Sequence, residues 1–320
     1  RPKRTIFLCA WDGEEQGLLG STEWMETHAD ELRQKAVVYI NSDSNERGFL
    51  YAGGPHTLEP FVTAVASAIT DPERQIPVSE RLRLSRIHDA ATADARKEIR
   101  DRKYLSIEAL GSGSDFTPFL QHLGIASLNL GYGGEGQEGV YHSIYDDFYW
   151  YSRFADTDFV YGRSLAQTIG TALMRLADAD LLPIDPTPLS DTVAGYVKEV
   201  RTLAQDKRDA AEELARQIDE GAPLAAADPR LPFVAPKKEA VPPYFDFSPL
   251  ENASADLTRA AKDSQAALSA AGPDLASDPA RVARVNAALR RIEPSLTREE
   301  GLPGRPWYRH YVYAPARSSS

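Results

Sequence analysis

The sequence predicts an α/β fold in its first half, a mainly parallel sheet with helices on both faces, followed by an all-α helical bundle domain. In the first half, short apolar runs suited to buried strands alternate with stretches of helical period. Beyond the Pro-rich residues 182–188 the chain keeps helical periodicity and shows no convincing strand. We therefore expect two domains, residues 1–183 and residues 184–320.

Sequence patterns typical of strands alternate with patterns typical of helices through the first half of the chain. The apolar run at residues 5–10 predicts a fully buried parallel strand, and residues 18–35 predict the helix that follows it. The other predicted elements are strands at 37–41 and 48–54, a helix at 57–70, a surface excursion with some helix at 71–110, a short helix at 114–123, a strand at 125–130, a Gly-rich loop at 131–139 and a long helix at 154–177.

The second half carries amphipathic helical patterns. A stripe of apolar residues begins at Val193 and ends at Leu203, and residues 257–271 and 280–292 repeat this character. Residues 221–248 are rich in Pro and Ala and predict a connection between helices. Such Ala-rich helices predict a small bundle that packs on the first domain or on a partner.

Composition excludes several classes of protein. A net charge of −11 argues against a nucleic-acid partner, and no run approaches the about 18 consecutive apolar residues of a membrane span. Cys9 is the only cysteine, so the chain has no internal disulfide. Because the first residue is Arg1 and a strand is predicted four residues later, we expect a fragment or processed piece of a longer protein.

Three short segments carry residues suited to metal chemistry. Glu14 and Glu15 follow the first predicted strand, Asp43 follows the second, and His142 follows the Gly-rich loop. The carboxyl ends of parallel strands meet at one sheet edge, and zinc accepts both His nitrogen and carboxylate oxygen. Two consecutive residues in an extended turn cannot both point at one ion. We therefore expect one Glu to bind metal and the other to act as a base toward water.

Each segment also has a simpler interpretation. Glu14 and Glu15 could open the next helix, where carboxylates complement the helix dipole. Asp43 could cap a helix or form a turn, and His142 could be an ordinary hydrogen-bonded histidine. Only the conjunction of the three segments favours a functional site. The other histidines are assigned structural roles: His28, His56, His88, His122 and His310.

Several motifs together resemble the family of co-catalytic zinc exopeptidases that includes glutamate carboxypeptidase II and the catalytically silent transferrin receptor. The matching motifs lie at residues 1–6, 11–15, 17–24, 39–44, 110–116, 123–127, 141–146, 301–310 and 313–315. The resemblance spans nearly the whole chain. It implies an incomplete zinc-exopeptidase fold, followed by a transferrin receptor-like dimerisation domain that forms a homodimer.

The resemblance also implies roles for the residues of the three segments. Glu14 corresponds to the general base, and Glu15 and His142 correspond to ligands of the catalytic zinc. Asp43 corresponds to a ligand of a second, co-catalytic zinc. The upstream zinc-binding His and the bridging Asp of the family are expected before Arg1. We therefore expect residues 1–320 alone to bind zinc poorly and to be inactive.

Other matched positions concern calcium and substrate. Glu23 and Glu26 correspond to ligands of a structural calcium, although an exposed helix face explains them nearly as well. Ser112 and Tyr141 correspond to residues that line the substrate pocket.

Substrate preference departs from that of the glutamate-specific enzyme. Asn129 lies in the segment where that enzyme carries an arginine patch, and Ser114 replaces an asparagine of its pocket. Arginine binds acidic side chains in bidentate pairs, which asparagine cannot replace. A preference for glutamate is therefore not expected.

We expect a di-zinc exopeptidase that acts on peptides. One alternative is a non-catalytic scaffold or receptor similar to the transferrin receptor, and another is an aminopeptidase with the same metals. By resemblance the protein is extracellular, periplasmic or at the cell surface, and any membrane attachment lies upstream of residue 1.

Overall fold

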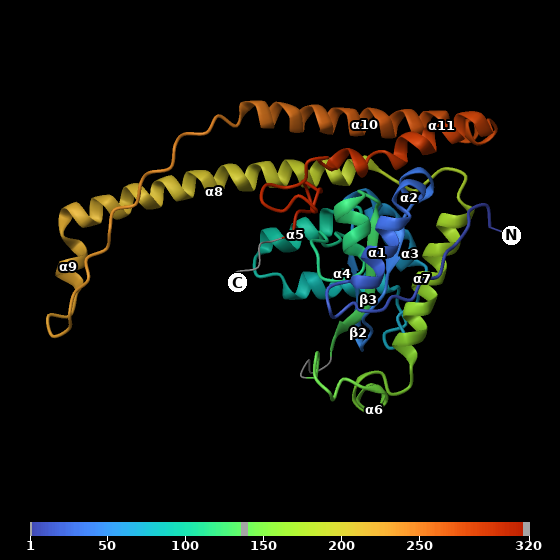
Figure 1. Ribbon diagram of the computed structural model, residues 1–320, viewed down its shortest axis with the longest axis horizontal. Helices are drawn as coiled ribbons and strands as arrows, with labels where there is room; N and C mark the ends of the chain where they lie inside the picture. Colours follow the sequence, from blue (N-terminus) through green and yellow to red (C-terminus); the bar gives the residue numbers. More distant parts are fainter. Residues whose placement is uncertain (1, 136–139, 316–320) are drawn as a thin grey trace. The chain divides into compact units, whose positions relative to one another are not determined.

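The computed structural model describes residues 2–135 and 140–315 (Figure 1). Contacts divide the chain into two compact units. The first contains residues 1–188 and 265–320, and the second contains residues 189–264. The expected boundary after residue 183 lies close to the first division, but the chain returns to the first unit at residue 265.

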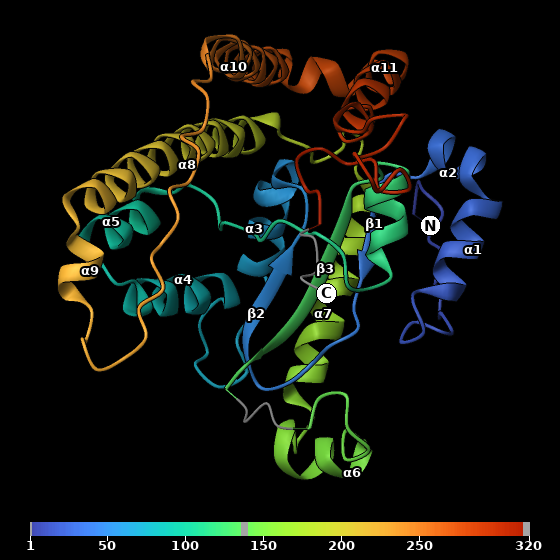
Figure 2. The same cartoon turned by 60° about the vertical axis from the view of Figure 1, so that its left-hand side comes forward.

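One small sheet lies at the centre of the first unit (Figure 2). Its strands are β1 (Tyr39–Asn41), β2 (Gly48–Gly53) and β3 (Ser127–Gly134), in the order β1-β3-β2. β1 is parallel to β3 and β2 is antiparallel to it. The α/β class is confirmed, but the described sheet is mixed rather than mainly parallel. The link between β1 and β2 is too short to return the chain to the end of the sheet where β1 began, so β2 runs opposite to β1 and therefore opposite to β3, which lies between them.

The predicted strand at residues 5–10 is wrong. This segment pairs with none of the described strands, and Phe7 and Leu8 are 74% and 88% exposed. The chain just before it is held at the end of the later helix α7 (Val160–Asp178), where the N–H of Arg4 donates to the carbonyl of Ala177 at 2.9 Å. An apolar run becomes a strand only where its backbone groups find a ladder partner, which apolarity does not encode.

Helices account for most of the remaining described structure. The predicted helix at 18–35 is two helices that meet at His28. The long helix expected from residue 154 begins at Val160, because Asp156 accepts the N–H groups of Tyr161 and Gly162 at its start. The described α-helices besides α7 are α1 (Leu19–Thr27), α2 (Ala29–Lys35), α3 (Glu59–Ser67), α4 (Val78–Asp89), α5 (Ala93–Asp101), α6 (Phe148–Trp150), α8 (Pro186–Glu220), α9 (Ala222–Ala226), α10 (Ser248–Ala276) and α11 (Pro279–Arg290).

Two other predicted elements have different limits. The short helix expected at 114–123 is a five-residue π-helical turn, Pro118–His122. β3 continues to Gly134, beyond the strand predicted at 125–130 and into the expected Gly-rich loop. Residues 136–139 of that loop lie outside the described residues.

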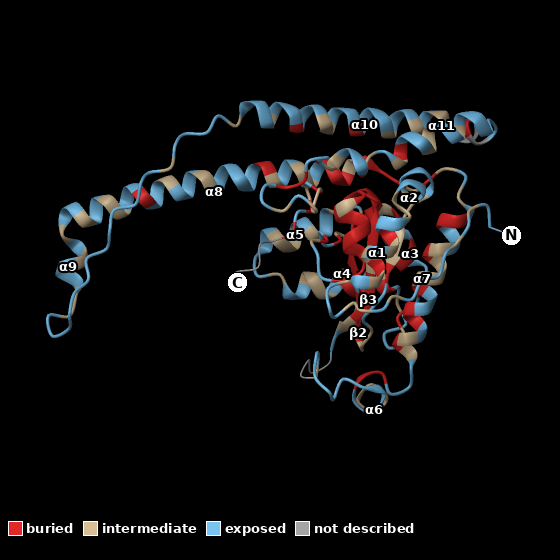
Figure 3. Cartoon of the chain, in the orientation of Figure 1, coloured by how far each residue is buried: buried red, intermediate tan, exposed pale blue. Residues whose placement is uncertain are grey.

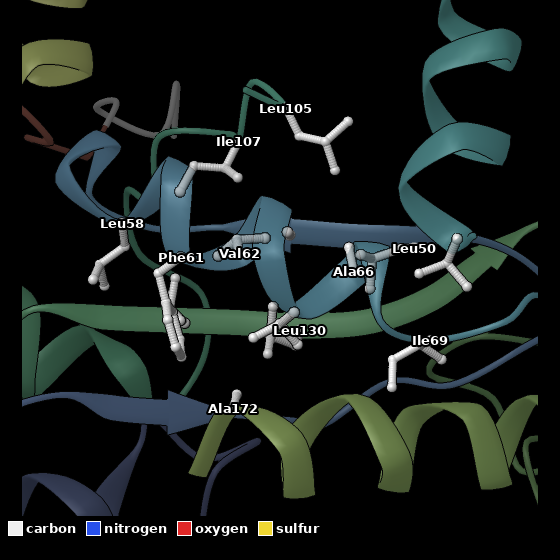
Figure 4. Close-up of a cluster of buried hydrophobic side chains, with 14 of the residues drawn as sticks. Leu50, Leu58, Phe61, Val62, Ala66, Ile69, Leu105, Ile107, Leu130 and Ala172 are labelled. Atoms are coloured by element: carbon white, nitrogen blue, oxygen red, sulfur yellow. The ribbon is translucent and has the colours of Figure 1, made fainter. Parts of the chain in front are cut away.

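Apolar side chains cover both faces of the sheet. Figure 3 shows the buried residues gathered around the strands, and Figure 4 shows Phe61, Leu130 and Ala172 in the larger cluster, which α3, β3 and α7 build. Ile40 of β1 packs on this cluster, whereas its neighbour Tyr39 packs on a second cluster. Successive strand residues point to opposite faces, so the prediction of helices on both faces is confirmed. The second cluster is centred on Met25, Phe119, Leu123 and Ile125.

The second unit is helical, as predicted. It contains most of α8, all of α9 and the first part of α10. Arg201 of α8 and Glu251 of α10 form an ion pair at 2.9 Å. None of the helices that the structure describes combines the length and apolarity needed to cross a membrane.

The last described residues are held within the first unit by buried polar groups. The Gln121 side-chain amide donates to the carbonyls of Gly111 and Tyr313 at 2.7 and 2.6 Å. The Tyr313 hydroxyl accepts the backbone N–H of His56 at 3.0 Å and lies 2.8 Å from its Nδ1. This contact fixes Tyr313 beside the turn that precedes α3.

His56 should make this docking sensitive to acid. Burial, assisted by the charge of Arg102, lowers the pKa of His56 to about 4 from its ordinary 6.5. Between these values the unfolded chain binds a proton that the folded chain does not, so stability falls as pH drops from 6.5 to 4. The expected loss by pH 4 is about 3 kcal/mol in the free energy of unfolding. Urea denaturation across this range, with His56→Asn beside the wild type, measures it.

The difference between wild type and His56→Asn should depend on pH only below 6.5. The matched control is His88→Asn, which removes an exposed histidine of α4. If the free energy of unfolding changed with pH in the same way in the wild type and in His56→Asn, this explanation would be contradicted.

Candidate functional site

The two neighbouring carboxylates lie on a tight loop before α1. The N–H of Gly20 donates to the carbonyl of Asp12 at 3.0 Å, and a Cβ at Gly20 would come within 2.3 Å of Asp12 Oδ1. Gly13 has a φ of +62°, which favours glycine. The first turn of α1 contains no acidic residue. Glu14 and Glu15 therefore do not open the helix; they project from the loop that precedes it.

His142 lies beside this loop. Its Nε2 is 3.2 Å from Oε2 of Glu15, although the two residues are far apart in sequence. Its ring stacks on that of Tyr141 with centroids 3.8 Å apart, and both side chains are exposed. The backbone of His142 has a φ of +58°, a strained conformation that is often found at functional sites. His142 is therefore not a buried structural histidine.

Asp43 follows β1 and is held by side chains. Asn41 Nδ2 donates to Asp43 Oδ2 at 3.1 Å, and the Ser114 hydroxyl donates a short hydrogen bond to the same oxygen. Asn41 also faces Asn129, its register partner on β3, at 3.3 Å. Asp43 therefore neither caps a helix nor closes a turn in the described structure. Two residues expected in the substrate pocket, Ser114 and Asn129, belong to the same network.

Glu14 lies within electrostatic reach of all three segments. Burial raises its pKa, and the negative charges of Glu15, Asp115 and Asp43 raise it further. His142 acts in the opposite direction. Burial also raises the pKa of Asp115, and the negative charge of Asp43 raises it further. The fold therefore gathers the predicted acidic groups around Glu14.

The remaining predicted site residues lie on exposed surfaces. Ser112 is exposed on the loop before Ser114. Glu23 and Glu26 are exposed on α1, and Oε1 of Glu26 accepts the indole N–H of Trp307 at 2.8 Å. One carboxylate oxygen of the two expected calcium ligands, Oε1 of Glu26, therefore already accepts a hydrogen bond.

Sequence reasoning gave no role to Tyr39, Asn41 or Asp115. The signal for the first two was period-two spacing, because Tyr39, Asn41 and Asp43 occupy alternate positions that point to one face. Asp115 carried no such signal. It follows a Gly- and Ser-rich loop, and its burial depends on tertiary packing.

The donor types fit zinc, but only in part. Glu15 and His142 bring a carboxylate oxygen and an imidazole nitrogen together, and zinc accepts both. Within residues 2–135 and 140–315, no group of three or more His, Cys, Asp or Glu side chains forms an arrangement able to hold a metal ion. These residues therefore supply a pair of donors and, separately, the Asp43 carboxylate.

Two family models match this chain in different regions. Residues 1–155, which contain all the acidic groups and the histidine of the site, match peptidase family M28. The first 155 residues are thus similar to this peptidase family. Residues 245–320 match the transferrin receptor-like dimerisation domain. The family expected from the motifs is confirmed.

Similar curated proteins match nearly the whole of this chain. The probable glutamate carboxypeptidase LAMP1 of Arabidopsis thaliana is 30% identical over 99% of the chain and 38% of its own length. The probable glutamate carboxypeptidase VP8 of Zea mays is 28% identical over 98% of the chain and 37% of its own length. Aminopeptidase NAALADL1 of Mus musculus is 26% identical over 100% of the chain and 38% of its own length. The chain thus spans less than two-fifths of these relatives.

Proposed function

We propose that this chain carries part of the catalytic centre of a metal-dependent exopeptidase, which hydrolyses terminal peptide bonds. The observation that supports the proposal most is the pairing of Glu15 with His142 beside Glu14. A carboxylate and an imidazole in contact supply two zinc ligands, and a third acidic group beside them can accept a proton.

The proposed roles follow from these positions. Glu15 and His142 would hold one zinc ion, and Asp43 would contribute to a second. When bound, zinc polarises the scissile carbonyl and lowers the pKa of the attacking water towards about 7. Glu14 accepts the proton of that water and passes it to the leaving amine.

The groups near Asp43 favour substrates with neutral side chains. Ser114 and Asn129 are uncharged, and no arginine takes part in the hydrogen bonds that join them to Asp43 through Asn41 in the described structure. A neutral pocket lacks the bidentate pairing that selects acidic side chains. We therefore propose neutral rather than glutamate-terminated peptides as substrates.

Aminopeptidase activity is the second candidate, because one relative is named an aminopeptidase. Hydrolysis of matched peptides, blocked either at the amino end or at the carboxyl end, separates the two. Cleavage only of carboxyl-blocked peptides identifies an aminopeptidase, and cleavage only of amino-blocked peptides identifies a carboxypeptidase. Failure to cleave either, with both metal ions bound, favours a non-catalytic scaffold.

A metal assay on the full-length protein tests the metal sites. We expect about two zinc ions per chain and loss of hydrolysis after chelation, with recovery on adding zinc. Calcium at Glu23 and Glu26 is part of the proposal, and replacing both by Gln should remove any calcium-dependent rise in the melting temperature. A full-length protein without bound zinc would contradict the peptidase proposal.

We also propose that the protein forms a homodimer through residues 184–320. The match of residues 245–320 to a transferrin receptor-like dimerisation domain supports this. An extracellular, periplasmic or cell-surface location belongs to the same proposal.

A further inference from the structure

A chain of hydrogen bonds runs from the loop that carries Glu14 to β1, which Asp43 follows. Trp11 Nε1 donates to the Tyr39 hydroxyl at 3.0 Å. The Tyr39 hydroxyl donates to Asn41 Oδ1, also at 3.0 Å. Trp11 and Tyr39 are partly buried and Asn41 is 5% exposed, so water competes weakly for these bonds.

The groups at the two ends set the direction of the chain, because the Trp11 indole can only donate and the ionised Asp43 carboxylate can only accept. An indole N–H can donate but cannot accept, so the Tyr39 oxygen must act as its acceptor. The hydroxyl hydrogen of Tyr39 is then free to donate, and Asn41 Oδ1 receives it. The Asn41 amide is thereby oriented with its Nδ2 on the opposite side, towards Asp43.

The oriented amide acts on one oxygen of the Asp43 carboxylate. Asn41 Nδ2 lies 3.1 Å from Asp43 Oδ2 and 3.0 Å from the Ser114 oxygen, which itself donates to Oδ2. Among the residues that the structure describes, both hydrogen bonds to this carboxylate therefore go to Oδ2. A flipped amide would place Asn41 Oδ1 against Oδ2, where two acceptors repel each other.

We propose that Asn41 is a positioning residue that presents Oδ1 of Asp43 to a metal ion. It holds Oδ2 in place with Ser114, and the Trp11–Tyr39 pair keeps its amide in the donating orientation. The inference rests on the proposed function, since it gives the Asp43 carboxylate a metal to bind. Replacing a group that orients a metal ligand typically lowers metal affinity or activity by roughly 10- to 100-fold.

Zinc titration of the metal-free, full-length protein tests the proposal. Asn41→Leu should weaken binding at the affected site about 10- to 100-fold, because Oδ2 loses its amide donor. Tyr39→Phe leaves Asn41 in place but frees its amide to flip, so a smaller loss of several-fold is expected. The matched control is Tyr151→Phe, which removes a hydroxyl that accepts from Asn45 at 2.8 Å, and it should not change zinc affinity.

The double variant Tyr39→Phe with Asn41→Leu distinguishes positioning from general damage. If Tyr39 acts only through Asn41, its removal should cause no further loss of affinity in the Asn41→Leu background. Melting temperatures of the metal-free variants provide a second readout. A loss of packing should lower the melting temperature of a variant. A loss of this hydrogen-bond chain should lower its zinc affinity.

The outcomes separate a failure of the proposed function from a failure of the positioning role of Asn41. Wild-type protein that binds no zinc overturns the proposed function and this inference with it. Wild-type binding with Asn41→Leu within twofold of it, or additive losses in the double variant, overturns only the positioning role. If Asn41→Leu does not fold, the tyrosine pair decides: weaker binding in Tyr39→Phe alone supports positioning, and equal affinity in Tyr39→Phe and Tyr151→Phe overturns it.

Discussion

Replacing Glu14 by Gln in the full-length protein is expected to lower kcat roughly 100- to 10,000-fold. Gln keeps the size and polarity of the side chain but cannot accept the proton of the attacking water. Glu15 and His142 remain in contact, so zinc content should stay unchanged. The KM should change little, because Glu14 is proposed to act on a proton and not to hold the substrate.

Turnover of a carboxyl-blocked and an amino-blocked peptide, with zinc content measured on the same samples, checks this prediction. Glu31→Gln is the matched control, because it makes the same substitution at an exposed position of α2. Retained turnover in Glu14→Gln would refute its role as the base. Loss of zinc together with activity would instead assign Glu14 to the metal.

Replacing Arg81 by Met should destabilise the first unit by about 3–5 kcal/mol. Arg81 and Asp71 are 5% and 1% exposed, and the guanidinium donates to Asp71 Oδ2 at 2.7 Å. It also donates to the Tyr161 hydroxyl at 2.7 Å and to the carbonyl of Gly48 at 3.3 Å. One side chain thus joins β2, α7 and the loop after α3. Met preserves much of its volume but leaves a buried carboxylate without its cation.

Urea denaturation measures this loss. Adding Asp71→Asn to Arg81→Met should recover part of it, because the uncompensated buried charge is then removed. Arg100→Met, at an exposed position of α5, should leave the free energy of unfolding nearly unchanged. An Arg81→Met protein as stable as the wild type would show that the buried ion pair adds no net stability.

Periodicity located most elements but not their pairing. Residues 37–41, 48–54 and 125–130 were all predicted as strands, and each contains or overlaps an observed one. The direction of β2 was not predicted, since strand patterns do not specify a neighbour. The prediction at residues 5–10 failed for the same reason, because an apolar run has the same pattern whether or not a partner strand lies beside it.

The site was predictable to the extent that residue type reveals chemistry. Glu14, Glu15, Asp43 and His142 were singled out because acids and a histidine followed predicted strands. The first of these strands did not form, yet the loop still brings Glu15 to His142. The tight loop before α1 and the strained backbone of His142 bring the two side chains together, and neither feature is visible in the spacing of the residues.

The sequence by itself determined which groups can donate, accept or bind a metal, and which stretches are helical. Tertiary structure alone decided that Asn41 faces Asp43 and Ser114, and that Tyr313 closes over His56. Side-chain chemistry is a property of each residue and is therefore legible one position at a time. A hydrogen bond between residues far apart in the chain depends on distances set by the packing of every element between them.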